Sequence, residues 1–588
     1  MSLCAASSVS LPASKPDNAN VIRRTGNFHP TLWGDRFSTY AGDDKVISMW
    51  QEEADKLKVK VRKMLMDRNS TENTRYNGKL NLIDAVQRLG LSYHFEEEIN
   101  EILEHIFVHG DNSIGDSDLH QTALMFRLLR QHGYRVSCDI FNKFKDTKSG
   151  RFKEYIAKDI AAMLSLYEAA HLRVHGEYIL DEALDYTTTT LTSVAAVNPS
   201  HPLSKHIMHA LQQSIRKSLP RGGARRYILM YEEQDSHDDT LLKFAKLDFN
   251  ILQKMHQKEL SLISRWWNNL DVKRNLSWAR DRIAELYLWI LDLFPSQCAS
   301  GRKFLAKVIA LTSIIDDFYD TYGTPEEHVH FTEAIERWEM SAIDMVPEFM
   351  RLCYQTLLDV YSEMEEEIAK EGNAYRIGYA KEAMKTLVRA YFEESKWINS
   401  DELPTYEEYM KIALVTCGYP MLIITSLVGM GDGVTKEDFD WLLGGPKIVE
   451  AASIITRLMD DMVENKGQLE EQDVRVPYAA DCYTYQYGIS VQQTHQIFNM
   501  FVQDAWKDIN EAHMRPAPAS RSVLNVALNL SRFMDEIYKD KDGYDDSNGK
   551  LKDYVTELLI DPVEIWPKKG EKTIDKILLR YMCPGIFI

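Results

Sequence analysis

FLAKVIALTSIIDDFYDTYGT, residues 304–324, is the stretch that decides the fold. Apolar side chains occupy nearly every side of this predicted helix, which is typical of a helix buried in the interior, and Gly323 marks its predicted end. Three acids, Asp316, Asp317 and Asp320, fall in its last two turns. The helix dipole is negative there and disfavours each unpaired carboxylate by ~0.3–1 kcal/mol, so the pattern predicts a bound cation.

A D-D-x-x-D pattern in an acidic chain also fits a solvated helix end. Asp316 and Asp320, however, are spaced i,i+4 and so lie one turn apart on one helix face. Two carboxylates in that position can bridge hard divalent cations that also hold phosphate oxygens. The pattern therefore indicates a magnesium site.

A second stretch, KIVEAASIITRLMDDMVENKG at residues 447–467, repeats this design. Small and apolar residues precede Asp460, Asp461 and Glu464, and Arg457 lies one turn before Asp460. Arg457 is either part of an intrahelical salt bridge, worth only ~0.3–0.5 kcal/mol when exposed, or a phosphate ligand. Beside two acidic clusters we favour the phosphate ligand.

A basic element precedes the first cluster by about 36 residues. Arg280 and Arg282 present guanidinium groups that can bind diphosphate oxygens, although they could instead be surface arginines neutralised by Asp281 and Glu285. Trp289 follows Arg282 by two turns, where it either packs in the core or faces a cation with its ring.

The whole chain sets the broad limits. It has 588 residues, enough for two or more domains, and 88 acidic against 69 basic residues give a formal net charge of -19. Such a charge excludes nonspecific attraction to nucleic acid. Seven cysteines without a C-x-x-C pair favour a reducing compartment, for which we expect the cytosol. We expect no integral membrane segment, because no window reaches the ~18–20 apolar residues of a span.

Helical punctuation predicts an all-α fold of two helical domains. Thr324 and Thr405 each begin a capping box, and Gly444-Gly445-Pro446 ends a predicted helix at 436–443. We expect a disordered leader at 1–22, an N-terminal domain at 23–245, a C-terminal catalytic domain at 246–565 and a tail at 566–588. The boundary near 245 is placed to within about ten residues either way.

Two acidic clusters, basic residues and an aromatic wall together describe ionisation of an allylic diphosphate to a carbocation. Metal ions and arginines would stabilise the departing diphosphate, and a dry cavity would steer the cation. The sequence contains no Walker loop that would indicate ordinary nucleotide hydrolysis.

From residue 21 to residue 565 the chain resembles the plant terpene synthases, specifically the angiosperm sesquiterpene cyclases. Residues 315–324, IDDFYDTYGT, match the family's DDxxD block, and Arg280 and Arg282 match its RxR motif. The resemblance implies a C-terminal class I helical bundle that encloses the active site and an N-terminal helical barrel-like domain. It also implies that Asp316 and Asp320 bind metal and that the two arginines hold diphosphate.

Further site residues follow from the same resemblance. Arg457 would contact diphosphate, and Trp289 would face the carbocation. Thr416-Cys417-Gly418 matches a helix break whose carbonyl groups line the pocket, which Gly418 makes physically reasonable. A block near the C-terminus would cap the closed site and contains Tyr538, Asp542 and Tyr544.

The second metal motif departs from the family pattern. The usual ligands occupy its first, fifth and ninth positions, which here are Asp460, Glu464 and Gln468, so the ninth carboxylate is missing. Glu464 creates a DDxxE motif like that of cadinene-type cyclases, and a carboxylate is a competent ligand for a hard metal. We expect three Mg²⁺ ions, with Mn²⁺ as a possible substitute, and count Asp317 and Asp461 among the metal-site residues.

Both ends of the chain carry further differences. Arg23-Arg24 and Trp33 reproduce a tandem-arginine pattern that is commoner in monoterpene cyclases. The N-terminal half contains no D-x-D-D string, so class II chemistry is not expected there. The tail at 566–588 extends past the end of relatives, and we assign it no function.

Four hypotheses remain open at this point. The first is a monomeric lyase that cyclises farnesyl diphosphate to a sesquiterpene and releases diphosphate. The others are a monoterpene synthase that uses geranyl diphosphate, a prenyl chain-elongating transferase, and a catalytically inactive binding protein, which the unusual Gln468 suggests.

Overall fold

The computed structural model describes residues 23, 28–40, 42, 44–67, 72–109, 118–198, 201, 203–398, 402–468, 477–539, 544 and 549–565, without the side chains of 72–76, 398 and 464–468. These residues form helices and connecting turns, with one isolated β-bridge between Lys145 and Phe152 and no strand within the described ranges. The predicted all-α fold is confirmed.

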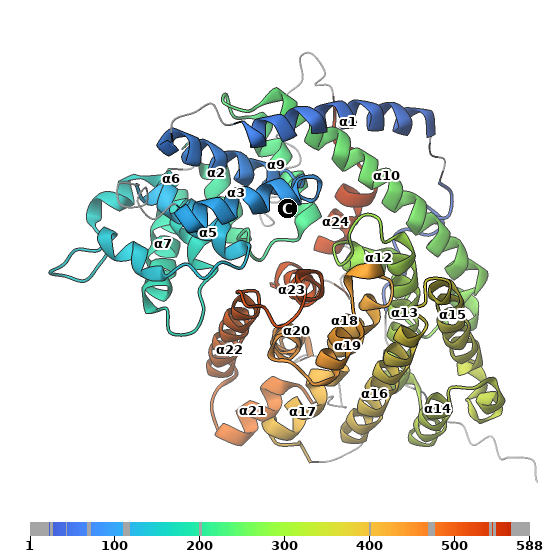
Figure 1. Cartoon of the computed structure of the whole chain (residues 1–588). Coiled ribbons are helices and arrows are strands. Elements are labelled where there is room, and N and C mark those ends of the chain that lie inside the picture. Colours follow the sequence, from blue (N-terminus) through green and yellow to red (C-terminus); the bar gives the residue numbers. More distant parts are fainter. Residues whose placement is uncertain are drawn as a thin grey trace, which may run out of the picture.

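The N-terminal half is a compact group of helices, coloured blue to green in Figure 1. A small apolar core, separate from the main core of the molecule, lies among α5, α6, α7 and α8, each of which packs on the next along the chain. The helices of this half are α1 (Asp44–Met66), α2 (Glu72–Arg88), α3 (Glu96–His109), α5 (Leu119–Gln131), α6 (Ile160–Ala170), α7 (Tyr178–Val197), α8 (Ser204–Gln212) and α9 (Pro220–Glu232), with short 3₁₀ turns at Ser92–His94, Cys138–Phe144 and Glu154–Lys158.

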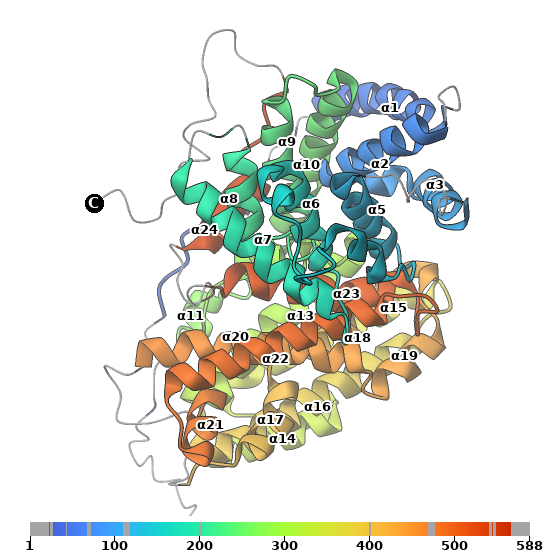
Figure 2. The same cartoon turned by 90° about the vertical axis from the view of Figure 1, so that its left-hand side faces the viewer.

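The C-terminal half is a larger bundle of helices, shown from two directions in Figures 1 and 2. Its elements are α10 (Asp239–Asn269), α11 (Val272–Asn275), α12 (Ile283–Leu291), α13 (Ala299–Asp317), the π-helical turn η4 (Phe318–Tyr322), α14 (Pro325–Arg337), α15 (Arg351–Ala369), α16 (Tyr375–Ile398), α17 (Tyr406–Thr416), α18 (Tyr419–Leu427), α19 (Lys436–Leu443), α20 (Lys447–Gln468), α21 (Ala479–Tyr487), α22 (Val491–Ala512), α23 (Arg521–Ile537) and α24 (Lys550–Leu559), with 3₁₀ turns at Met340–Met345, Glu348–Met350 and Gly431–Gly433.

The two halves share one continuous apolar core. Helix α1 packs along α10, and α24 returns from the C-terminus to pack against α9, α10 and α12. Residue 245, near which the domain boundary was predicted, lies inside α10, which begins at Asp239.

Local sequence signals explain where several helices begin and end. Thr324 and Thr405 cap α14 and α17, each in a reciprocal capping box with the glutamate three residues later, as predicted. Helix α19 ends at Leu443 before Gly444, also as predicted.

One stretch of the described chain, Tyr406–Leu427, is long and apolar enough to cross a membrane by length and composition alone. It is two helices, α17 and α18, which meet at Gly418, and 67% of its most apolar window is buried inside the protein. These properties are typical of a core helix pair.

Candidate active site

The first acidic cluster lies where α13 changes its helical geometry. The helix is α-helical to Asp317 and continues as one π-helical turn, closed by a 2.8 Å hydrogen bond from the Gly323 amide to the Phe318 carbonyl. The sequence pattern predicted an ordinary α-helix that ends at Gly323. The end of the helix is confirmed, but its last turn is π-helical and therefore wider than expected. A side chain at Gly323 would collide with Phe318 and His328, at 2.5–2.6 Å. Such turns often occur at functional sites, because they redirect side chains.

Arg280 holds the middle acid of this cluster. Its backbone amide donates to Asp317 at 2.7 Å, and its guanidinium lies 2.7 Å from Asp317 and 2.8 Å from Asp316. The Asp317 side chain is 2% exposed, whereas that of Asp316 is 29% exposed. Asp317 is therefore fixed in the interior, and Asp316 retains access to solvent.

The carboxylates of this cluster are costly to ionise together. Burial raises the pKa of Asp317 to about 6, although the Arg280 charge opposes the shift. Burial and the neighbouring charges of Asp316 and Glu394 raise the pKa of Asp320 well above its usual range. A cation beside these groups would remove the repulsion.

The second cluster, at the C-terminal part of α20, is built in the same way. Asp461 is fully buried and accepts hydrogen bonds from Arg457 Nε at 2.6 Å, from Tyr409 Oη at 2.9 Å and from the Ala479 amide at 2.7 Å. The Arg457 guanidinium also pairs with Asp460, whose side chain is 22% exposed. The intrahelical salt bridge considered for Arg457 is thus present, in a buried site rather than on the surface.

Glu394 lies between the two clusters, and sequence analysis missed it. This residue of α16 accepts a 3.0 Å hydrogen bond from Thr416 Oγ1. Burial raises the pKa of Glu394 to about 7, with contributions from Asp316 and Asp461 and an opposing one from Arg457. Helix α16, which carries Glu394, packs on the π-helical turn η4 and on α17, and α17 packs on α20, so the two clusters lie on adjoining elements. No motif marks a glutamate inside an amphipathic helix, so only the fold reveals it.

The predicted helix break is confirmed. Helix α17 ends at Thr416, Cys417 follows it, and Gly418 adopts a left-handed conformation with φ +78° before α18 begins. Thr416 is the residue that holds Glu394, so the break and the acidic space adjoin.

An arginine–aromatic wall surrounds Tyr544. The guanidinium of Arg280 lies 4.9 Å from the centre of the Tyr544 ring, and Arg282 Nε donates to the Tyr544 carbonyl at 3.4 Å. Trp289 meets the Tyr544 ring edge-on at 5.8 Å and stacks on Phe533 at 4.6 Å. Arg282 is 1% exposed, so it is not the surface arginine considered as an alternative.

Tyr538 directly follows α23 and lines a cavity of about 290 Å³ together with Met459 and Met462 of α20. Asp542 lies outside the described residues, as do the side chains of Glu464 and Gln468, whose backbones continue α20.

The N-terminal segment reaches this site. Arg23 donates to Glu327 at 2.6 and 2.8 Å and to the carbonyl of Tyr322 in the π-helical turn at 3.1 Å. The carbonyl of His29 accepts from Arg282 at 2.8 Å. Trp33 Nε1 donates to Glu285 at 2.9 Å, while Arg24 and the leader at 1–22 lie outside the described residues.

The residues fit oxygen-seeking divalent cations. The donors are carboxylates that repel one another, and Mg²⁺ binds proteins through one or two such groups together with water and substrate phosphate. In the described part of the chain no three His, Cys, Asp or Glu side chains are grouped so that they could hold a metal ion by themselves.

Comparison with known proteins identifies the family. Residues 32–211 match the model for the terpene synthase N-terminal domain, and residues 268–508 match the model for the terpene synthase family metal binding domain. The chain belongs to the terpene synthase family.

Similar proteins agree with this assignment over nearly their full length. The chain is 54% identical to (-)-germacrene D synthase of Vitis vinifera over 565 residues, 95% of this chain and 99% of that one. It is 48% identical to sesquiterpene synthase 2 of Toona sinensis over 550 residues, 93% of this chain and 97% of that one. Isoprene synthase from grey poplar, solved with three Mg²⁺ ions and dimethylallyl-S-thiolodiphosphate, superposes with a TM-score of 0.82 at 30% identity, over 89% of this chain and 98% of that one. The predicted family and two-domain helical fold are confirmed.

Proposed function

We propose that this terpene synthase ionises farnesyl diphosphate in the space between the two acidic helix ends and cyclises the cation to a sesquiterpene. The observation that carries the proposal is that two arginine-held acidic clusters, at Asp316 and at Asp460, lie on elements that adjoin through α16 and α17. The similarity to a sesquiterpene synthase supports the fifteen-carbon substrate.

The outer acids are the metal ligands in this proposal. Asp316, Asp320 and Asp460 are the described candidates, with Glu464 and Gln468 completing the second cluster. Asp317 and Asp461 lie in the same clusters, where arginines and backbone amides fix them and they orient their neighbours. Bound Mg²⁺, three ions as in the poplar structure, with Mn²⁺ able to replace them, would neutralise the diphosphate oxygens as the C–O bond breaks.

The arginines and aromatic rings take the remaining roles. Arg282 has a buried Nη2 without a hydrogen-bond partner among the described residues, so it can donate to diphosphate. Arg280 and Arg457 can exchange part of their carboxylate pairing for phosphate oxygens once metal neutralises those carboxylates. Trp289 faces the carbocation and stabilises it with its ring, while the carbonyl groups around Thr416, Cys417 and Gly418 line the pocket.

The C-terminal block closes the site in this proposal. Tyr544, which contacts Arg280 and Trp289, belongs to it, as does Asp542. Tyr538, which directly follows α23, belongs to the same C-terminal block. We further propose that the enzyme acts as a cytosolic monomer on a freely diffusing prenyl diphosphate.

The experiment is incubation with Mg²⁺ and farnesyl, geranyl or geranylgeranyl diphosphate separately, followed by gas chromatography of a solvent overlay. We expect sesquiterpenes from farnesyl diphosphate and loss of product in excess EDTA and in Asp316→Ala. Asp440→Asn, an exposed acid on α19 paired with Lys436, is the control that keeps activity.

Three results would contradict the proposal. Monoterpenes from geranyl diphosphate alone would assign the chain to the smaller substrate. Longer soluble diphosphates after addition of isopentenyl diphosphate would show chain elongation. Saturable Mg²⁺-dependent binding without any turnover would show an inactive binding protein.

A further inference from the structure

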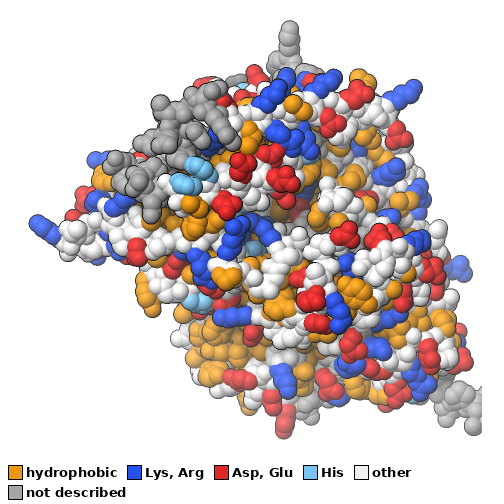
Figure 3. Space-filling model, viewed as in Figure 1, with side chains coloured by type: hydrophobic (Ala, Val, Ile, Leu, Met, Phe, Trp, Pro, Cys, Tyr) orange, Lys and Arg blue, Asp and Glu red, His pale blue; other side chains and the backbone are white. Residues whose placement is uncertain are grey.

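A cavity of about 280 Å³ lies between the two halves of the molecule, away from the acidic clusters. Helices α2 and α5, the segment before α9, and α23 all contribute to its walls. Figure 3 shows lysine and arginine side chains gathered on this face, between the N-terminal half and α23. Five arginines line the cavity: Arg88, Arg127, Arg216, Arg521 and Arg532.

Two of these arginines are neutralised by one acid. Asp84 forms an ion pair with Arg127 and lies 3.7 Å from Arg88. Within the described residues the other three arginines form no ion pair. The cavity therefore has an excess of positive charge.

Arg216 is the most strongly isolated of the three. It is 4% exposed, its Nε donates to the neutral amide oxygen of Asn510 at 2.8 Å, and its buried Nη2 has no partner among the described residues. Ser218 Oγ, also buried in the cavity wall, likewise lacks a partner there. Burial, with the charges of Arg532 and Arg521, lowers the pKa of Arg216 well below its usual range.

The neighbours of Arg216 also bind only neutral groups. Arg532 donates to the Arg216 carbonyl at 2.9 Å and to Asn529 at 2.8 Å, and Arg521 donates to the Gln131 carbonyl. Burial lowers the pKa of Arg532 to about 10, and Arg521 adds to the shift while Asp292 opposes it. A folded protein rarely keeps several unpaired buried cations together, because each costs several kcal/mol to desolvate.

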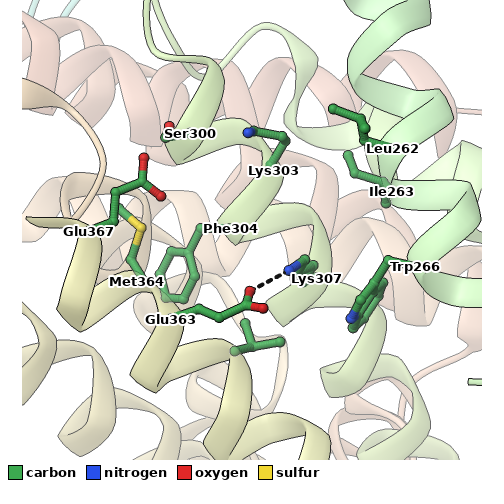
Figure 4. A pocket seen from close by; sticks show the side chains of 11 residues that line it. Leu262, Ile263, Trp266, Ser300, Lys303, Phe304, Lys307, Glu363, Met364 and Glu367 are labelled. Atoms are coloured by element: carbon green, nitrogen blue, oxygen red, sulfur yellow. Dashed lines mark hydrogen bonds and ion pairs between the residues drawn. The ribbon is translucent and has the colours of Figure 1, made fainter.

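A second cavity, shown in Figure 4, is a useful contrast. It is also about 280 Å³ and lies between α10, α13 and α15. Its lysines, Lys303 and Lys307, are matched by Glu363 and Glu367, and Lys307 lies 2.6 Å from Glu363. Balanced charges of this kind need no ligand, whereas in the arginine cavity Arg216, Arg521 and Arg532 have no ion-pair partner among the described residues.

We propose that the arginine cavity binds a multiply charged phosphate-type oxyanion, which pairs with Arg216, Arg521 and Arg532 and fastens the two halves together. Guanidinium groups bind phosphate oxygens in a bidentate manner, and Ser218 supplies a further donor. At roughly 30 Å³ per water-sized group, the cavity has room for phosphate or diphosphate. Free phosphate and the diphosphate released by the proposed reaction share this chemistry.

The test is thermal unfolding with increasing phosphate or diphosphate, in EDTA so that the metal-dependent site does not bind them. Potassium chloride of equal ionic strength corrects for screening. We expect either oxyanion to raise the Tm saturably by about 2 °C or more, and the one with the lower Kd identifies the occupant.

Arg216→Met separates this proposal from general anion effects. We expect it to weaken the oxyanion affinity at least about tenfold and to unfold at the same or a higher temperature than the parent without oxyanion, because an unpaired buried charge is gone. Arg389→Met, which removes a surface arginine paired with Glu336, should keep the full oxyanion shift.

Two outcomes would overturn the proposal: no saturable shift in the parent protein, or an equal shift in Arg216→Met. If Arg216→Met does not fold, Arg532→Met with direct calorimetric titration of each oxyanion replaces it. Neither outcome bears on the turnover of farnesyl diphosphate. If the oxyanion proposal fails, the product assay still tests the proposed function independently.

Discussion

The two acidic helix ends share a plan and differ in how they carry it out. In each, the middle acid is buried and held by an arginine and a backbone amide: Asp317 by Arg280, and Asp461 by Arg457 and the Ala479 amide. In each, the first acid, Asp316 or Asp460, remains partly exposed beside the same arginine.

The differences lie in the arginine and in the helix. Arg280 comes from a separate segment before α12 and reaches α13 from outside, whereas Arg457 belongs to α20 itself. Helix α13 ends in a π-helical turn, while α20 continues as an ordinary helix to Gln468. The middle acid of each cluster is thus fixed by its partners, whereas the outer acids, which we propose as metal ligands, keep access to solvent.

The largest expected effect is at the outer acid of the π-helical turn. Asp320→Asn should lower kcat by about 10³-fold, since a metal ligand supplies several kcal/mol of transition-state stabilisation, ~4 kcal/mol here. The same change should raise the Tm of the metal-free protein, because desolvation and the neighbouring charges of Asp316 and Glu394 disfavour the ionised form of Asp320 and raise its pKa. Steady-state kinetics and melting curves in EDTA measure the two effects. Lower activity together with lower metal-free stability would show that Asp320 is a positioning residue.

Substitution of the middle acids, Asp317 and Asp461, should lower the stability of the metal-free protein rather than raise it. Asp461→Asn and Asp317→Asn should each destabilise the metal-free protein by ~1–3 kcal/mol and weaken Mg²⁺ binding by about 10–100-fold. Asp461→Asn should cost more, because Asp461 accepts from three different residues and Asp317 only from Arg280. Urea unfolding in EDTA, with Asp440→Asn as the exposed control, compares them. Equal stability of both variants with the parent would contradict the anchoring role.

Much of this arrangement was predictable from the sequence. The spacing of Asp316 and Asp320 on an oily helix, the repeat of that design at Asp460, and the break at Gly418 all reflect local patterns, and the structure places them as the patterns indicate. Capping boxes fixed helix starts for the same reason, since the signal lies within four residues.

The remainder depended on contacts between distant segments. Glu394 has no motif, and its place follows only from the packing of α16 on the π-helical turn η4 and on α17. The π-helical turn depends on the close approach of Gly323 to His328. The arginine cavity joins α2, α5 and the segment before α9 to α23, which lies far along the chain.

A smaller effect is expected on the pH dependence of stability, which should distinguish Glu394 from the acids of the two clusters. Its folded pKa of about 7 exceeds the ordinary value of 4.5, so the folded protein keeps a proton that the unfolded chain loses between these values. The metal-free protein should therefore lose stability as pH rises from about 4.5 to 7. Glu394→Gln should reduce this loss, to which Asp317 and Asp320 also contribute, and be more stable than the parent at pH 8 but not at pH 4. Melting curves across pH, with exposed Glu393→Gln as the control, measure it, and parallel curves for parent and Glu394→Gln would count against the assignment.

The smallest effect concerns the helix break that holds Thr416 beside Glu394. Gly418→Ala should cost ~1–2 kcal/mol through its left-handed backbone alone, since an added methyl group there meets no atom within 4 Å. Gly378→Ala, in the interior of α16 and equally uncrowded, should instead stabilise by ~0.5–1 kcal/mol. Urea unfolding compares the two, and the same sign for both would show that backbone conformation is not the cause.

The central claim is that both helix ends act on one diphosphate, and a double-mutant cycle tests it most directly. Diphosphate release from farnesyl diphosphate is measured in Asp316→Asn, Asp460→Asn and the double variant at saturating Mg²⁺. If the clusters work as one unit, the double variant should be no more than about tenfold slower than the slower single variant. Losses that multiply fully in the double variant would show two independent sites and contradict the account.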